Sequence, residues 1–169
     1  MNDSTNALFR EEQRLRLWWA WLAIVTIAGV ACYFFLVPVI FGTPVGTNPA
    51  PDAVVVVVWL VFGVGLPLFG YAIKLVTTVR TDGVVVRFFP LATRRISLRD
   101  VAAYQVRRYR AIAEYGGWGI RFGRHKKRAW TTGGDAGVEL EFTDGTRLLI
   151  GSQRAEELAG ALGTAKDSQ

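Results

Sequence analysis

The segment of residues 53–73, AVVVVVWLVFGVGLPLFGYAI, decides the fold of this chain, because it runs for 21 residues without a charged side chain. As a helix rising ~1.5 Å per residue it would be ~31 Å long, close to the thickness of the hydrocarbon core of a bilayer. A β-strand of this length would far exceed the usual ~3–10 residues. The sequence therefore predicts a membrane-spanning helix, which we place at residues 53–76.

A second uncharged segment precedes the first. No Lys, Arg, Asp or Glu lies between Arg16 and Asp52, and the apolar part is residues 17–41. A cleaved signal peptide is the alternative, but the residues after Cys32 stay apolar and two glutamates lie upstream. We expect a two-helix transmembrane hairpin of residues 17–41 and 53–76, with an external loop over 42–52. Residues 1–16 then form a cytoplasmic N-terminal segment, and residues 77–169 form a separate cytoplasmic domain.

Basic residues flank this hairpin on the sides that face the termini. They are Arg10, Arg14 and Arg16 before the first span and Lys74, Arg80 and Arg87 after the second. The loop over 42–52 has neither Lys nor Arg, so the positive-inside rule predicts a multi-pass plasma membrane protein with both termini in the cytoplasm. Gly63, Gly65 and Pro67 suit either close helix packing or a kink in a transport path. Transport normally needs an ionisable residue within a span, so we favour an anchor and keep a small transport or channel subunit as the alternative.

The net charge of +6 belongs to the C-terminal domain, because the acidic and basic side chains of residues 1–76 balance. A basic domain tethered to a bilayer is attracted to the anionic headgroups of that leaflet. Nucleic acid would feel the same field, so charge alone does not choose between these ligands. A single cysteine excludes an intrachain disulfide and any zinc site built from several cysteines.

Short alternating segments with turn signals follow Lys74 and are typical of a small antiparallel sandwich or barrel. The expected strands are 77–80, 84–88, 95–98, 102–109, 119–122, 130–131, 138–142 and 146–150. A two-residue turn at Asp144-Gly145 would place a charge beside the apolar face of the last hairpin. A three-residue loop with Gly145 in the left-handed region instead pairs Glu141 with Arg147, and we prefer it. A helix capped by Ser152 and ending near Gly163 completes an α+β fold.

Several strands closed by one C-terminal helix form the outline of a pleckstrin-homology-like domain. Three motifs add to this outline: Tyr115-Gly-Gly-Trp-Gly-Ile-Arg121, Gly137-Val-Glu-Leu140 and Ile150-Gly-Ser-Gln-Arg154. With them the chain resembles a family of uncharacterised two-span prokaryotic membrane proteins that carry a bacterial pleckstrin-homology-like domain. The likeness covers essentially the whole chain, including the glutamate-bearing segment before the first span. It implies a fold and a membrane location, and it transfers no activity.

An aromatic-flanked basic loop is the most unusual local feature of the C-terminal domain. Its candidate contacts for anionic lipid or a partner are Trp118, Arg121, Arg124, Lys126, Lys127, Arg128 and Trp130. The alternative is a solvated loop whose charges help to keep the domain inside. Pleckstrin-homology domains that bind phosphoinositides place basic residues between their first two strands. Here we expect that position to be the turn of residues 81–83, which carries an acid and no base.

No catalytic constellation stands out in the sequence. His125 has no nearby nucleophile and orienting acid, and the glycines of residues 116–119 lack the Lys-Ser/Thr pair of a phosphate-binding loop. Glu139 and Glu141 share one strand face, where we expect solvent. We therefore expect no enzyme, no cofactor and no metal, but a membrane-anchored adaptor that binds an unidentified protein or the anionic leaflet. A membrane tether for nucleic acid is the weaker alternative.

Overall fold

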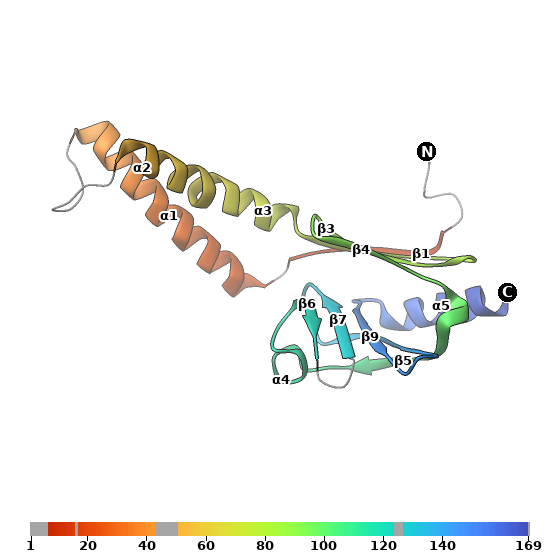
Figure 1. Cartoon of the computed structure of the whole chain (residues 1–169). Coiled ribbons are helices and arrows are strands. Elements are labelled where there is room, and N and C mark those ends of the chain that lie inside the picture. The colour runs from red at the N-terminus through yellow and green to blue at the C-terminus, as the bar shows by residue number, and fades with distance from the viewer. Residues whose placement is uncertain (1–6, 16, 43–50, 124–126, 169) are drawn as a thin grey trace. The chain divides into compact units, whose positions relative to one another are not determined.

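The computed structural model describes residues 7–15, 17–42, 51–123 and 127–168, and the chain divides into two compact units. One unit is Leu17–Ala72, and the other joins Met1–Arg16 to Ile73–Gln169. Helices of the first unit and strands of the second are labelled in Figure 1 where there is room. The helical unit is thus inserted into the chain of the β unit rather than placed before it.

Two long apolar helices make up the helical unit. α1 spans Trp18–Phe41, and the second helix runs from Asp52 to Ala72 through α2 (Asp52–Val58), the π-helical η1 (Trp59–Gly65) and α3 (Leu66–Ala72). Both are long and apolar enough to cross a membrane. Within these helices the buried residues are Ala31 and Gly70, whereas the core helices of a soluble protein are mostly buried. The expectation of two such helices is confirmed.

Glycines bring the two helices close together. A Cβ on Gly70 would lie 2.8 Å from Ile24 Cδ1, and one on Gly63 would lie 3.4 Å from Cys32 Sγ. The rings of Phe35 and Trp59 stack with their centroids 4.4 Å apart. In these contacts small residues let two apolar helices pack closely.

The first sheet of the β unit has four antiparallel strands in the order β1-β2-β3-β4. They are β1 (Ala7–Arg14), β2 (Lys74–Arg80), β3 (Gly83–Phe89) and β4 (Ala92–Ile96). The segment 1–16, which we expected to stand apart, therefore contributes an edge strand, whose Arg14 pairs with Lys74. The second helix ends at Ala72 rather than at residue 76, because residues 74–80 alternate between the core and the outer face of this sheet.

The second sheet has five strands in the order β5-β8-β9-β7-β6. They are β5 (Val101–Arg108), β6 (Gly119–Phe122), β7 (Lys127–Thr131), β8 (Ala136–Phe142) and β9 (Arg147–Gly151). β7 pairs with β9 in parallel and the other neighbours are antiparallel, so this sheet is mixed rather than purely antiparallel. Two short helices lie between strands, η2 (Leu98–Asp100) and α4 (Ala111–Tyr115).

The β8–β9 hairpin has the register that its sequence favours. Glu141 pairs with Arg147, Leu140 with Leu148 and Val138 with Ile150. Gly145 has φ 75°, and its N–H donates to Phe142 O at 2.9 Å. The three-residue loop is therefore confirmed.

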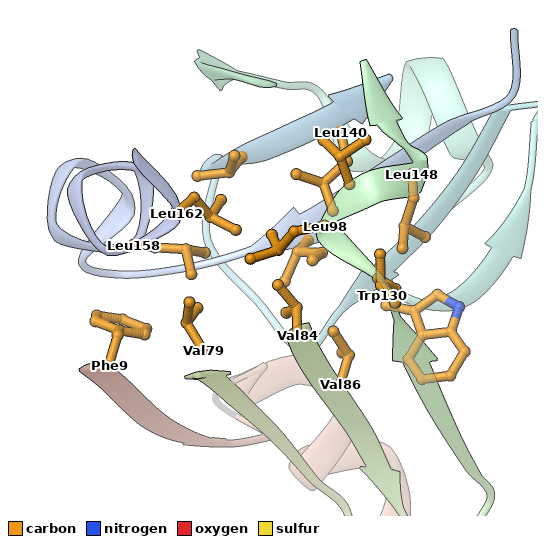
Figure 2. Packing of buried hydrophobic residues seen from close by; sticks show 14 of the residues in the cluster. Phe9, Val79, Val84, Val86, Leu98, Trp130, Leu140, Leu148, Leu158 and Leu162 are labelled. Carbon is orange, nitrogen blue, oxygen red and sulfur yellow. The ribbon is translucent and has the colours of Figure 1, made fainter. Parts of the chain in front are cut away.

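One apolar core joins the two sheets and the C-terminal helix α5 (Ala155–Asp167), as Figure 2 shows. The first sheet contributes Phe9, Val79, Val84 and Val86, and the second contributes Trp130, Leu140 and Leu148. Leu158 and Leu162 of α5 point into the same core.

α5 continues past Gly163, where we expected it to end. Leu158, Leu162 and Ala165 are buried at helical spacing. Burial of Ala165 packs one further helical turn after Gly163 against the core. A Cβ on Gly163 would lie 2.9 Å from the Tyr104 hydroxyl, so this glycine permits a close approach instead of ending the helix. Lys166 then donates to Val101 O at 2.9 Å.

Candidate functional site

The basic loop of residues 121–130 is only partly a surface feature. Arg124 and Lys126, like His125, lie outside the described residues. Arg121 and Arg128 are exposed, and the Arg128 guanidinium lies over the Phe122 ring, 5.3 Å from its centroid. Lys127 is half-buried.

The two tryptophans that flank this loop have structural contacts. Trp130 is buried in the shared core, so its ring does not reach the surface. Trp118 is half-buried against the small cluster of Tyr109 and Tyr115, and its Nε1 donates to Gly134 O at 3.3 Å. The aromatic flanks of the loop thus hold the second sheet together.

A larger basic surface lies on the outer side of the first sheet. Side chains alternate along each strand, and directly paired residues share a face. The basic side chains on this side are Arg10, Arg14, Lys74, Arg80, Arg87 and Arg95. Among the described strand residues of this side the acidic side chain is Glu12, whose Oε1 lies 3.2 Å from Lys74 Nζ. We call this surface the basic sheet face.

The pairing register sets the order of residues across the basic sheet face. One row is Arg14, Lys74 and Phe89; the next is Glu12, Val76, Arg87 and Thr93; the third is Arg10, Thr78, Val85 and Arg95. The first row is where the chain leaves for α1 and returns from α3. A basic row therefore marks both chain connections to the helical unit.

A hollow of about 560 Å³ opens on the same face beyond the first row. Its basic lining residues are Arg10, Arg80, Arg87 and Arg95, and its acidic ones are Asp82 and Asp100. The guanidinium groups outnumber the carboxylates, so the hollow favours an anion. Arginine forks match phosphate and carboxylate oxygens in geometry as well as in charge.

Sequence reasoning missed the basic sheet face because it did not recognise β1. The signal is present as alternation: Phe9, Glu11 and Gln13 are buried, whereas Arg10 and Arg14 are exposed. Glu11 and Gln13 are polar although they lie at inward positions, so the alternation of apolar and polar residues expected of a strand is not apparent. Without β1, Arg10 and Arg14 are not placed on the same face as the arginines of β3 and β4.

The inward polar residues of β1 fasten this strand to the second sheet. Glu11 accepts hydrogen bonds from Ser152 Oγ at 2.5 Å and from Gln153 N–H at 2.9 Å. The Gln13 amide donates to Gly151 O at 2.9 Å. The glutamate-bearing N-terminal segment and the Ile150–Arg154 motif thus meet at one buried polar site, which is a structural fastening.

A second buried carboxylate corrects the expectation that Glu139 faces solvent. Glu139 is 3% exposed, accepts from Arg107 Nη1 at 3.0 Å and accepts from Gln105 Nε2 at 3.2 Å. Arg107 also pairs with Glu114 of α4. Burial opposes the charge of Arg107, but the hydrogen bond with Glu114 and the charge of Glu139 outweigh it and raise the arginine pKa.

Glu114 is held ionised by the same contacts. Burial acts to raise its pKa, but the Arg110 N–H at 2.9 Å and the Arg107 guanidinium outweigh that effect, so its pKa is lowered. This network fixes α4 on the second sheet.

Among the residues that the structure describes, no group of three or more His, Cys, Asp or Glu side chains could hold a metal ion. A family of unknown function (DUF6141) matches residues 1–169. No curated protein matches the sequence.

Proposed function

The chain belongs to that family of unknown function, and from this premise we propose that it is a membrane-anchored, non-enzymatic binding module. In this proposal the two apolar helices cross the plasma membrane. They hold a pleckstrin-homology-like β domain at the cytoplasmic leaflet, where the basic sheet face binds anionic lipid headgroups. A protein partner is an additional ligand of the same domain.

Strand pairing supports the same-side placement of both chain ends. β1 precedes the first apolar helix and β2 follows the second, and the two strands pair along their length. Strands that pair must lie on one side of a bilayer, so two crossings are the arrangement that fits. The basic residues near both connections favour the cytoplasmic side.

The pleckstrin-homology-like assignment draws support from the order of elements. A meander of four strands is followed by β5, β8 and β9 as consecutive antiparallel neighbours and then by the closing helix α5. The β6–β7 pair adds to the edge of the second sheet. On this assignment the connection between the first two strands is the helical hairpin itself, and the turn of residues 81–83 joins the second and third strands. The usual inositide loop is therefore replaced by the anchor.

The observation that carries the proposal is the basic sheet face, which begins at the two residues where the chain joins the helices. Each basic side chain near an anionic surface contributes ~1 kcal/mol, so several together favour contact between this face and the leaflet. Such attraction weakens as salt rises, since the Debye length is ~10 Å at 0.1 M.

Full-length protein in lipid vesicles tests this proposal. With Cys32 replaced by serine, a spin label at Thr78→Cys reports on the basic sheet face, and one at Glu156→Cys on the exposed start of α5 serves as control. We expect the Thr78 label to lose collisions with an aqueous relaxation agent in anionic vesicles, and to regain them in neutral vesicles or high salt. Arg87→Gln with Arg95→Gln should reduce the effect. A Thr78 label that ignores lipid charge and salt would exclude headgroup binding by this face.

A further inference from the structure

The turn between β3 and β4 exposes apolar side chains. Phe89 is 44% exposed and Leu91 60% exposed, and Pro90 between them is exposed as well. The Leu91 N–H donates to Phe88 O at 2.8 Å, which closes the turn. An isolated apolar residue on a surface is ordinary, but consecutive ones at a turn tip form a protruding apolar point.

The register of the first sheet places this turn beside the chain connections to the helices. Phe89 pairs with Lys74, which in turn pairs with Arg14. Ile73 is the single residue between the end of α3 at Ala72 and Lys74. Successive Cα atoms are ~3.8 Å apart and antiparallel partners ~5 Å, so the path from Phe89 through Lys74 and Ile73 to the last helical residue is about 13 Å long.

Two basic side chains lie beside the apolar turn of residues 89–91. Lys74 is its partner across the strand pair, and Arg87 lies two residues before Phe89 on the same face. Apolar tips bordered by Lys and Arg suit the membrane interface, where the ring or aliphatic chain enters the lipid and the charges remain at the headgroups. The opposite turn of the same sheet, residues 81–82, carries Asp82 and has no large apolar side chain.

We propose that the Phe89–Leu91 turn inserts into the headgroup–acyl boundary of the leaflet in which the apolar helices end, as a third attachment of the chain to the bilayer. The proposal rests on the proposed function, in that it takes both helices to span the membrane. A lipid surface is the favoured occupant because Phe89 pairs with Lys74, which is two residues after the end of α3. The polar region of a bilayer is ~5–7 Å deep on each side, which the side chains of one turn can cross.

Depth-dependent quenching in vesicles tests this insertion with the full-length chain. On the Cys32→Ser background, an environment-sensitive fluorophore is attached at Leu91→Cys, and separately at Phe89→Cys in case one label disturbs the turn. Glu156→Cys, at the exposed start of α5 and outside the basic sheet face, is the control. Leu22→Cys in α1 is the lipid-facing reference.

The Leu91 and Phe89 labels should shift to shorter emission wavelengths and be quenched by lipids that carry a nitroxide near the headgroup. The Leu22 label should respond most to deeper nitroxides, and the Glu156 label to neither. If the Leu22 label is quenched while both turn labels behave like the Glu156 label, the turn does not insert, and the membrane anchor stands. If the Leu22 label is not quenched either, the proposed membrane function itself fails. Protection of the turn labels only after a protein is added would replace lipid by a protein partner.

Discussion

Glu11 shows how one residue ties the two halves of the β unit together. Its carboxylate lies on the inward side of β1, where a strand would ordinarily place an apolar residue, and it accepts hydrogen bonds from the Ser152 hydroxyl and the Gln153 amide. The segments that meet there are 141 residues apart in sequence. A buried group with well-matched partners specifies one pairing of segments more sharply than another apolar residue would.

Replacing Glu11 should therefore destabilise the β unit far more than replacing its neighbour. In Glu11→Ala the buried Ser152 hydroxyl and the partly buried Gln153 N–H lose their acceptor, which costs about 2–4 kcal/mol. Glu12→Ala removes an exposed ion pair with Lys74 and should change the unfolding free energy by less than about 1 kcal/mol. Urea titration of the detergent-purified chain, read by pulse proteolysis, measures both. Equal losses for the two variants would contradict the fastening role of Glu11.

Tyr109 gives the β unit a defined alkaline sensitivity. Burial raises the pKa of Tyr109 to about 12, against ~10 for an exposed tyrosine. Between about pH 10 and pH 12 the unfolded chain therefore loses a proton that the folded chain keeps, so stability is full below pH 10 and falls as the pH rises. The loss from this residue approaches about 2 kcal/mol near pH 12.

Tyr109→Phe should reduce this alkaline loss. Unfolding free energies at pH 8 and pH 11 provide the measurement, with Tyr71→Phe in the helical unit as the control that keeps the wild-type difference. At pH 8 the variant should be weaker by about 1 kcal/mol, because the hydroxyl no longer donates to Gly133 O at 3.3 Å. An unchanged pH 8-to-11 difference in Tyr109→Phe would show that other groups cause the alkaline loss.

At the scale of elements, sequence patterns predicted those parts whose signal is local. The two helices follow from unbroken apolar runs, and the β8–β9 register follows from keeping Leu140 opposite Leu148. The predicted second helix is too long, because Leu75 and Val76 are apolar like the span before Lys74 but already belong to the alternating strand β2. The predicted C-terminal helix is shorter than α5, because a glycine such as Gly163 often ends a helix. The packing of Gly163 against Tyr104 is not visible in the sequence.

β1 could not be predicted, for two physical reasons. Its last residue, Arg14, pairs with Lys74 of β2, sixty residues later in the sequence. No turn signal can link two strands that are so far apart. Its inward side carries Glu11 and Gln13, which satisfy their hydrogen bonds with residues far along the chain. Glu139 eluded prediction in the same way, because its partner Arg107 lies on another strand. Buried polar pairs break the alternation from which a strand is recognised.

The candidate site of residues 121–130 stays a prediction, and the structure adds a second basic surface to it. The sequence indicated a basic, non-catalytic surface on the C-terminal domain, and it concentrated that surface on the loop of residues 121–130. The structure buries Trp130 of that set and adds the basic sheet face, which depends on β1. The charges were visible in the sequence, but their grouping required the strand register.

At the scale of the whole molecule, the β unit is a complete domain whose chain makes an excursion of residues 15–73. We expect a chain in which Asn-Gly replaces residues 15–73 to fold as a soluble domain, because Arg14 and Lys74 already form the pair that a two-residue turn closes. Residues 74–169 alone should not fold. They lack Phe9, whose loss from a core costs about 3–5 kcal/mol, and the Glu11 fastening, out of a typical total of about 5–15 kcal/mol.

Size-exclusion chromatography and amide hydrogen exchange distinguish these two chains. The Asn-Gly chain should be monodisperse with protected amides in β2, whereas residues 74–169 should aggregate or exchange rapidly. Stable folding of residues 74–169 by themselves would show that β1 is dispensable. Failure of the Asn-Gly chain alone would mean that the helical unit is needed for the β unit to fold.

The insertion of the helices between β1 and β2 also imposes an order on biosynthesis. At ~5–20 residues per second, β1 leaves the ribosome some 3–12 s before β2, and the Ser152 that fastens it comes later still. During that interval the intervening residues enter the bilayer, in the topology proposed above. A first span inserted in the wrong direction would leave β1 across the membrane from every strand it must join. The domain can then fold only when the hairpin is inserted in the correct direction. A chain inserted in the wrong direction would keep an unfolded domain, which proteases would degrade.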